Sequence, residues 1–377
     1  MKRIFALLFL LPALAFAWEP TKPVAVMVGN TPGAGNEIAF RKLAEIVQKN
    51  NPKFTYVVLN IPGADSVVCN NRFTEADADG HTINLPSHMS SYVTNDIWEK
   101  KVKKYEWDTF VDVLTMGKSP LTLVAHPSSK INTPQEFVRR ISTTREPINI
   151  AVGGGAHRTA YEYLMEKGKG NRDLIKPIKF NGPMPAVQSV ASYDGKAGTE
   201  FGIMPIAVAR PLVEAGKVKI IGFTGTRKMP QYPDVAMLKD VAPGINVYAA
   251  WSIQLPKGTP NDVVEWYQRE FARAVRSEEY KEWRRQNVVF YEEDELTPAG
   301  LKKHMKELRD TFLPVLDKID LDTYLNSNGV AETQALNWTK ELQISTKKNP
   351  VRDKIYYWGN QDFFDYSKNN DYKLFIN

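Results

Sequence analysis

Continuous apolar runs alternate along the chain with segments whose apolar residues recur every three or four positions. Each continuous run predicts a buried strand, and each periodic segment predicts one apolar face of a helix. The predicted strands lie at 24–28, which is a continuous apolar run, and at 56–59, 82–85, 121–125, 148–152, 219–223 and 251–255. Strands that alternate with helices indicate right-handed crossovers and parallel sheets. The pattern therefore predicts an α/β fold.

Several predicted helices begin with a hydroxyl residue followed by proline. Thr133, Pro134 and Glu136 have the spacing of a capping box with proline at the first helical position. The pairs at 259–260 and 297–298 repeat this Thr-Pro beginning. The first predicted helix, which carries Ala39 and Leu43, instead follows a glycine-containing loop.

The first 17 residues have the pattern of a secretory signal peptide. Lys2 and Arg3 form a basic head, residues 4–16 are almost wholly apolar, and small residues precede Trp18. The apolar run is too short to span a bilayer as a helix. We expect cleavage after residue 17; an uncleaved signal that anchors the protein is the alternative.

Composition fits a folded protein of about two domains. The chain has 377 residues, of which 43% are apolar and 24% charged, and a domain usually takes about 150 residues. The single cysteine, Cys69, excludes a disulfide framework within the monomer and a cysteine-built zinc site. The five histidines have no spacing typical of a metal site. We therefore expect no metal and no cofactor.

The net charge is mildly basic. It is +6 for the whole chain and would be +4 after loss of Lys2 and Arg3 with the signal peptide. Such a charge favours encounters with anions in general. No run of lysines and arginines interleaved with aromatic residues is present, so nucleic acid is not an expected partner.

Three loops at 31–36, 62–65 and 153–157 share one design, a strand followed by a glycine-containing turn and then a helix or tight turn. Glycine lets a ligand approach the main chain, and a helix N-terminus favours an anion. The chain lacks the nucleophile-elbow, phosphate-loop, dinucleotide and H-E-x-x-H motifs. The loops therefore predict an anion-binding site without catalytic residues, although the glycines could also serve tight turns alone.

Six segments, taken in order, carry a family resemblance. They are P-G-A-G-N-E-I-A-F-R (32–41), N-I-P-G-A-D-S (60–66), A-D-G-H-T-I (78–83), I-K-F-N-G-P-M-P-A (178–186), the stretch 215–235, and W-S-I-Q-L-P-K-G-T-P (251–260). Together they resemble the substrate-binding proteins of tripartite tricarboxylate transporters, also called Bug receptors. The resemblance covers about residues 20–288. The chain departs from the family pattern where Ala34, Asp65 and Ser66 replace glycines.

The resemblance implies a two-domain periplasmic binding protein of type II, a Venus flytrap with parallel-rich sheets and a hinge. Domain 1 would comprise residues 18–120 and 246–330, domain 2 residues 121–245, and residues 331–377 a C-terminal extension. Such a receptor is not an enzyme. It would act in the periplasm as a monomer, capture a small carboxylate (an organic acid or acidic amino acid) and deliver it to the transporter's membrane subunits.

A different function remains open at this point. The extension after residue 330 is rich in aromatic residues and lies outside the family pattern. It could pack across the body of the protein or form a partner-binding arm. The second possibility motivates an alternative, a ligand sensor or adaptor for a membrane signalling partner without transport.

The resemblance also implies ligand-binding residues on two walls of a cleft. The first wall would consist of Asn30, Thr31, Gly33, Ala34, Gly63 and Ala64. The second would consist of Gly154, Gly155, His157, Arg158, Thr159, Phe180, Gly182 and Glu200.

Three residues of the second wall have specific expected roles. Arg158 could pair with a ligand carboxylate or be a solvated surface residue. His157 is expected to be a structural hydrogen-bond donor rather than a titrating group. Glu200 would favour a ligand amine or hydroxyl if it faces the cleft, and would otherwise be a surface carboxylate.

Overall fold

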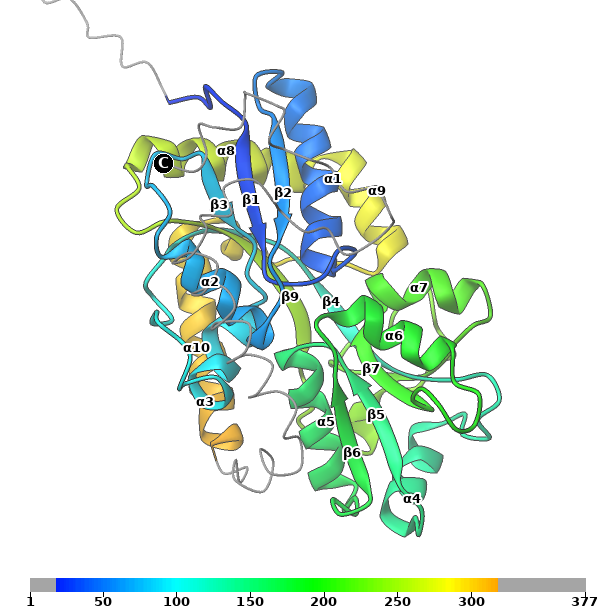
Figure 1. Cartoon of the computed structure of the whole chain (residues 1–377). Helices are drawn as coiled ribbons and strands as arrows, with labels where there is room; N and C mark the ends of the chain where they lie inside the picture. Colours follow the sequence, from blue (N-terminus) through cyan, green and yellow to red (C-terminus); the bar gives the residue numbers. More distant parts are fainter. Residues whose placement is uncertain (1–17, 318–377) are drawn as a thin grey trace, which may run out of the picture. The chain divides into compact units, whose positions relative to one another are not determined.

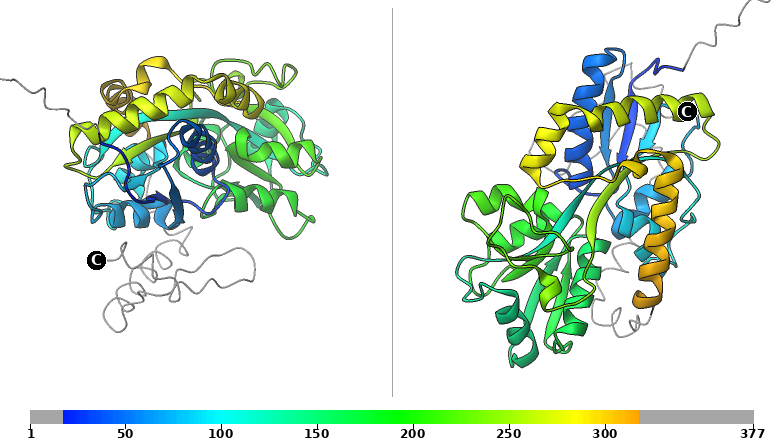
Figure 2. Two further views of the ribbon diagram at one scale, coloured as in Figure 1. Left: turned by 90° about the horizontal axis from the view of Figure 1, so that it is seen from above. Right: turned by 180° about the vertical axis from the view of Figure 1, so that it is seen from behind.

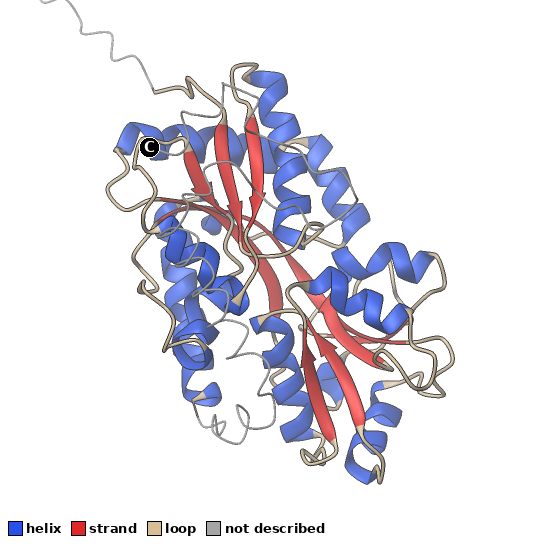
Figure 3. Ribbon diagram, in the orientation of Figure 1, coloured by secondary structure: helices blue, strands red, loops and turns tan. Residues whose placement is uncertain are grey.

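The computed structural model describes residues 18–317, and in this part of the chain strands and helices alternate from end to end (Figures 1 and 3). The strands are β1 (Val24–Val28), β2 (Tyr56–Asn60), β3 (Thr82–Asn84), β4 (Val111–Ala125), β5 (Ile148–Val152), β6 (Ile175–Lys179), β7 (Phe201–Pro205), β8 (Lys219–Phe223) and β9 (Tyr248–Leu255). The predicted signal peptide, residues 1–17, and the predicted extension, residues 331–377, lie outside the described residues.

The helices fall into α-helices and short turns of other types. The α-helices are α1 (Gly35–Asn50), α2 (Val67–Phe73), α3 (Asn95–Trp98), α4 (Pro134–Thr143), α5 (Gly155–Lys167), α6 (Pro183–Ala191), α7 (Ile206–Glu214), α8 (Asn261–Arg276), α9 (Glu278–Asn287) and α10 (Pro298–Leu316). The short elements are the 3-10 turns η1 (Ala64–Ser66), η3 (Leu238–Asp240) and η4 (Glu293–Leu296) and the π-helical segment η2 (Ser90–Thr94).

Two long strands join two lobes. The strand order is β2-β1-β3-β9-β4-β7-β5-β6, with β8 also paired to β4. Strand β4 pairs with β9 as far as Pro120 and with β7 from Leu121 onward. We call the part built on β1, β2, β3, β9 and the first half of β4 lobe 1. The part built on β5 to β8 and the second half of β4 is lobe 2 (Figure 1).

The predicted parallel pairing is present within each lobe. Strand β1 runs parallel to β2 and β3, and β5 runs parallel to β6 and β7. Strands β4 and β9 run antiparallel to their neighbours, which the alternation of strands and helices did not predict. The sheets are therefore mixed, with the antiparallel strands at the connection between the lobes.

Lobe 1 is covered by helices on both faces. Helix α1 packs against α8 and α9, whereas α10 packs against η2 and β4 (Figure 2). The predicted apolar face of α1 is confirmed, because Ala39, Leu43, Ile46 and Val47 are all buried. Within residues 18–317 no helix combines the length and the apolar character needed to cross a bilayer.

Two of the predicted helix starts are capped as expected. Thr133 accepts from the backbone N–H of Glu136 at 3.2 Å, and the Glu136 carboxylate accepts from the N–H of Thr133 at 3.1 Å, so the capping box is confirmed. Thr297 caps α10 through the N–H of Gly300 at 3.1 Å. Thr259 instead donates to the carbonyl of Pro256 at 2.8 Å, and α8 begins after Pro260.

Candidate ligand-binding site

A small cavity lies between the two lobes. Its volume is about 30 Å³. Because one water needs about 10–15 Å³, this space holds about two waters. Its walls are Asn30, Ala34, Gly35, Asn36, Ser87, His88, Met89, Ser90, Gly153, Gly154, Gly155, Ala156, His157, Pro183, Pro205, Ala249, Ala250 and Trp251. The lobes are therefore closed on each other, and a ligand of several heavy atoms needs them to separate first.

The N-terminus of α1 forms the lobe 1 side of the cavity. Asn36 donates through Nδ2 to Oδ1 of Asn30 at 3.2 Å and to the carbonyl of Leu85 at 2.7 Å, which fixes both amides. Glu37 accepts from the N–H of Gly33 at 3.2 Å, and Arg41 forms an ion pair with it at 2.7 Å. This carboxylate is therefore satisfied within its own loop and helix.

The N-terminus of α5 forms the lobe 2 side. The N–H of Gly155 donates to Oγ of Ser90, on lobe 1, at 3.2 Å. A Cβ at Gly155 would lie 2.3 Å from Oγ1 of Thr94 and 3.0 Å from Oδ2 of Asp65. Glycine is required here because lobe 1 approaches the main chain of α5 so closely.

Asp65 is the acidic group at this contact. Its backbone is left-handed, with φ of 50°, as are Ala64 at 44° and Ser66 at 76°. Thr94 donates to its Oδ2 at 3.4 Å, and Ser90 also hydrogen-bonds the carboxylate. Burial raises the pKa of Asp65, while nearby Lys179 acts in the opposite direction.

Further contacts cross from one lobe to the other. The N–H of Thr31 donates to the carbonyl of Asn181 at 3.2 Å. Lys179 of β6 donates to Glu99 at 2.7 Å. The guanidinium of Arg158 lies 3.6 Å from the ring centroid of Trp98, at the end of α3. These contacts hold the two lobes together in the closed arrangement.

The cavity wall combines apolar groups with neutral polar groups and carries no lysine, arginine, aspartate or glutamate. Among its residues only His88 and His157 could titrate near neutrality. Burial lowers the pKa of His157 to about 3 and lowers the pKa of His88 well below its usual value, with His304 and Lys118 adding to the latter shift. Both imidazoles are therefore neutral, and any anion in the cavity would be held by neutral donors.

His88 is buried with its hydrogen-bonding capacity unused. It is 1% exposed, and neither ring nitrogen has a partner among residues 18–317. A buried polar group without a partner costs about 1–3 kcal/mol. A ligand that hydrogen-bonds this imidazole would recover part of that free energy.

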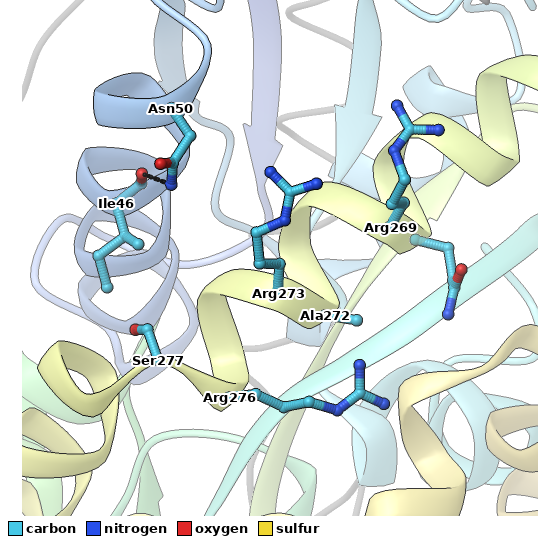
Figure 4. Close-up of a pocket in the computed structure, with 8 residues that line it drawn as sticks. Ile46, Asn50, Arg269, Ala272, Arg273, Arg276 and Ser277 are labelled. Atoms are coloured by element: carbon cyan, nitrogen blue, oxygen red, sulfur yellow. Dashed lines mark hydrogen bonds between the residues drawn. The ribbon is translucent and has the colours of Figure 1, made fainter.

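A larger hollow lies on the outer surface of lobe 1, between α1 and α8 (Figure 4). Its volume is about 670 Å³, and Arg269, Arg273 and Arg276 project from α8 around it. The first two form ion pairs with Glu270 at 2.9 and 3.1 Å, and the third pairs with Glu293 at 2.5 Å. Because the hollow is open and its arginines already have partners, the cavity between the lobes is the better candidate site.

The chain is similar to a known family of proteins. The family model described as tripartite tricarboxylate transporter family receptor matches residues 38–295, which is more than half of the chain. The chain belongs to this receptor family. The family consists of solute-binding proteins rather than enzymes, so the resemblance drawn from the six sequence segments is confirmed.

Two curated relatives are similar along most of the receptor. A protein from the gbd 5' region of Cupriavidus necator is 25% identical over 284 residues, covering 72% of this chain and 80% of the relative. BugT of Bordetella pertussis is 22% identical over 262 residues, covering 68% of this chain and 78% of BugT.

Two solved structures share the receptor's fold. The periplasmic binding protein BugD has a TM-score of 0.73 at 22% identity, covering 80% of this chain and 98% of BugD. MatC of Rhodopseudomonas palustris, solved with bound malate, has a TM-score of 0.71 at 21% identity, covering 79% of this chain and 99% of MatC. The predicted fold class, a two-domain periplasmic binding protein of the α/β type, is thereby confirmed.

The structure brings part of the predicted site together. The predicted residues that line the cavity are Asn30, Ala34, Gly154, Gly155 and His157. Others lie at the contact between the lobes: the N–H of Thr31 bonds to Asn181, a Cβ at Gly33 would touch Met184, and a Cβ at Gly182 would lie 2.7 Å from Oγ1 of Thr31. That these residues contact a ligand stays a prediction.

Other predicted residues are enclosed away from the cavity wall. Gly63, with φ of 140°, and Ala64 belong to the loop that turns Asp65 inward. The hydroxyl of Thr159 donates to the carbonyl of Gly155 at 2.9 Å, within α5. The N–H of Phe180 donates to the carbonyl of Val152 at 2.8 Å, and its ring packs on the core of lobe 2.

The structure bears on three expectations about single residues. Arg158 is 5% exposed, so it is not a solvated surface residue, and its guanidinium stacks on Trp98 beside Glu162 rather than lining the cavity. His157 accepts at Nδ1 from the N–H of Gly153 at 3.0 Å, so this nitrogen is an acceptor rather than a donor. Glu200 lies just before β7, and its carboxylate accepts from the hydroxyl of Ser129 at 2.7 Å. The cavity is lined by Pro205, at the opposite end of that strand, and not by Glu200.

Sequence reasoning missed the third segment of the wall, Ser87–Ser90, and the part of β9 around Trp251. The signal at residues 87–90 is weak, since a serine, a histidine, a methionine and a serine after a short strand follow no motif. Their place at the end of β3, beside the end of β1, could have been inferred from the rule that ligands lie beyond the carboxyl ends of parallel strands.

Proposed function

We propose that this protein is a periplasmic solute-binding receptor that captures a small carboxylate between its lobes and delivers it to a tripartite tricarboxylate transporter. The observation that carries the proposal is the cavity between the lobes, where neutral polar groups and the N-termini of α1 and α5 meet around the unpartnered imidazole of His88. Helix N-termini and neutral donors hold a carboxylate without a fixed cation. Malate bound to MatC is consistent with such a ligand.

The proposal includes a hinge at β4 and β9. Within residues 18–317, only these strands and the segments beside them connect the lobes, and β4 changes partners between Pro120 and Leu121. We therefore keep the boundaries at 120/121 and 245/246 as those of two moving units. Opening would expose the α1 and α5 termini, and closing around a ligand would leave a cavity larger than 30 Å³.

The ligand carboxylate is proposed to lie at the start of α1, where Ala34, Gly35 and Asn36 line the cavity. The first backbone N–H groups of a helix have no partner within the helix. His88 and Ser90 would contact the rest of the ligand. The cellular setting follows the family, with residues 1–17 removed on export and the closed, monomeric receptor docking on the membrane subunits.

Thermal unfolding of the purified protein with organic acids, amino acids and aromatic acids tests the proposal, combined with the ring-preserving change His88→Phe. A ligand should raise the melting temperature, and the rise should grow with the logarithm of its concentration once that exceeds its Kd. His88→Phe should weaken that ligand about tenfold, which is one lost hydrogen bond of about 1.4 kcal/mol. The variant itself should be as stable as the wild type or more stable, because a buried polar group without a partner is removed.

The control is His304→Phe, which changes a histidine whose ring centroid lies 6.1 Å from that of His88 but which does not line the cavity. It should leave the affinity unchanged. No shift with any of the acids, together with an empty protein by mass spectrometry, would contradict the proposal.

A further inference from the structure

The N-terminus of α5 already has a carboxylate beside it, and that carboxylate belongs to the protein. Asp65 comes from the β2–α2 loop of lobe 1 and lies against Gly154 and Gly155 of lobe 2. A Cβ built at Gly154 would lie 3.4 Å from its Oδ1, and one built at Gly155 would lie 3.0 Å from its Oδ2. An anion is the group that a helix N-terminus favours.

The surrounding hydroxyl groups complete this arrangement. Ser90 accepts from the N–H of Gly155 at 3.2 Å and hydrogen-bonds Asp65, and Thr94 donates to Asp65 at 3.4 Å. Asn95 holds the backbone carbonyl of Asp65 at 3.2 Å. Ser90 also lines the cavity, so its hydroxyl group lies between the cavity and the Asp65 carboxylate.

The two ends of the cavity therefore differ in charge. Near α1, the carboxylate of Glu37 is neutralised by Arg41 at 2.7 Å. Near α5, Asp65 lies close to two cations, and each of them also pairs with a glutamate: Lys179 with Glu99 at 2.7 Å and Arg158 with Glu162 at 3.9 Å. A ligand group at the α5 end therefore meets a carboxylate whose nearby cations are shared with other carboxylates, whereas the carboxylate at the α1 end has its own arginine.

A second feature points to a ligand in the same cavity. His88 lies two residues before Ser90, lines the cavity, and has neither nitrogen paired within residues 18–317. A neutral imidazole offers one donor and one acceptor. It can thus bind a hydroxyl, an amine or an amide, groups that a neighbouring carboxylate favours or tolerates.

We propose that Asp65 determines ligand specificity by occupying the α5 N-terminus in place of a ligand carboxylate, so that the receptor selects ligands with a single carboxylate and an uncharged or cationic far end. This inference rests on the proposed function and narrows it. The ligand's one carboxylate lies at α1, and its other end faces Ser90, His88 and the negative charge behind them. A dicarboxylate would place a second negative charge beside Asp65.

The test compares ligands of equal length that differ only at the far end. The four-carbon set is succinate, butyrate and 4-aminobutyrate, and the six-carbon set is adipate, hexanoate and 6-aminohexanoate. Calorimetry measures each affinity for the wild type, Asp65→Asn, which keeps the shape and removes the charge, and Asp65→Gly, which also suits the positive φ. Asp112→Asn is the matched control, because Asp112 is an enclosed carboxyl of lobe 1 bound by Tyr92 and Gln254 rather than by α5.

The wild type is expected to bind the amino acid or the monocarboxylate more tightly than the dicarboxylate. Both Asp65 variants should shift the ratio of dicarboxylate to monocarboxylate affinity at least tenfold toward the dicarboxylate, and Asp112→Asn should shift it less than twofold. An unchanged ratio in both Asp65 variants, or an equal shift in the control, overturns the inference while leaving the receptor function standing.

The outcomes without wild-type binding are equally decisive. If the wild type binds no acid in either set but Asp65→Gly binds succinate or adipate, the inference is supported and the proposed function of the native chain fails for these sets. If Asp65→Gly also binds neither dicarboxylate, removal of the internal carboxylate has not freed a place for an external one, and the inference is overturned.

Discussion

The N-termini of α1 and α5 face the same cavity, yet each is completed by a carboxylate of different origin. Helix α1 has Glu37 in its own first turn, bound to Gly33 and paired with Arg41. Helix α5 has no acidic residue in its first turn and receives Asp65 from the opposite lobe. The first arrangement survives any separation of the lobes, whereas the second exists only when they are closed.

This difference shows where closure is decided. The contacts of Glu37 with Gly33 and Arg41 lie within lobe 1, so they stabilise that lobe and do not change when the lobes separate. Contacts around α5 are lost on opening and regained on closing, so changes there act on that equilibrium and on ligand affinity. Substitutions at matched positions of the two helices should therefore have different consequences.

The largest contrast is expected between Gly155→Ala and Gly35→Ala. A Cβ at Gly155 would lie 2.3 Å from Thr94, on the other lobe, so the variant should fold but fail to close and should lose about 100-fold in ligand affinity. A Cβ at Gly35 would lie 2.1 Å from the ring of Trp251, in the same lobe. That variant should lose about 1–3 kcal/mol of unfolding free energy through overpacking, with its closure unchanged.

Chemical denaturation gives the stabilities, and fluorescence energy transfer between dyes on the two lobes gives the closure. Glu75→Cys and Lys196→Cys supply exposed labelling sites. Cys69 is fully buried, and burial raises its pKa to about 12, so it should not compete for the dye. If Gly155→Ala closes as the wild type does, the assignment of closure to the α5 contact is wrong.

The fold was largely predictable because its elements are local. The strands β1, β5 and β8 have the bounds that their apolar runs predict. Strand β4 was predicted only from residue 121, because Lys118 and Pro120 interrupt its apolar pattern. Lys118 is buried there through its pairing with Glu295, a contact between residues far apart in the chain that no local pattern contains.

The site was predictable only as far as its loops carry motifs. The glycine loops gave Asn30, Ala34, Gly154, Gly155 and His157, which line the cavity. The role of Asp65 was not apparent, because a lost glycine in the sequence does not indicate where the new side chain points. The packing of Arg158 on Trp98 depends on how the lobes close and could not be deduced from the surroundings of either residue in the chain.

The second contrast concerns the two carboxylates at neutral pH. Glu37→Gln should lose about 1.5 kcal/mol of unfolding free energy, because its charged hydrogen bonds and the pair with Arg41 weaken. Asp65→Asn should instead raise the unfolding free energy at neutral pH. The pKa of Asp65 is raised above its unfolded value, so its contribution to stability is full below that value and is lost as the pH rises through the native pKa.

Unfolding free energies measured from pH 3 to pH 8 check this contrast. The stability of Asp65→Asn relative to the wild type should be near zero at the acid end and should increase with pH. Lys179, Arg158 and Ser90 oppose the shift, while burial and Glu99 cause it. A relative stability that falls with rising pH would falsify the account of Asp65 as an enclosed, poorly solvated carboxylate.

The smallest effect is expected from the ion pair between Lys179 and Glu99, which bridges the lobes at 2.7 Å with side chains 25% and 14% exposed. A pair near the surface contributes about 0–1 kcal/mol. Lys179→Met should therefore lower the closed fraction by no more than about fivefold and should weaken the salt dependence of closure. Arg276→Met is the control, since it breaks an ion pair of 2.5 Å with Glu293 that lies within lobe 1.

The direction of the companion change separates the two roles of this pair. Lys179 forms the bridge to Glu99, and its positive charge also has the largest effect of those that lower the pKa of Asp65. Glu99→Gln removes the bridge but also removes the negative charge that opposes Asp65, so it should open the lobes less than Lys179→Met does. Equal opening in both variants, by the same energy-transfer measurement, would mean that the bridge alone matters and that the charge of Asp65 does not contribute to closure.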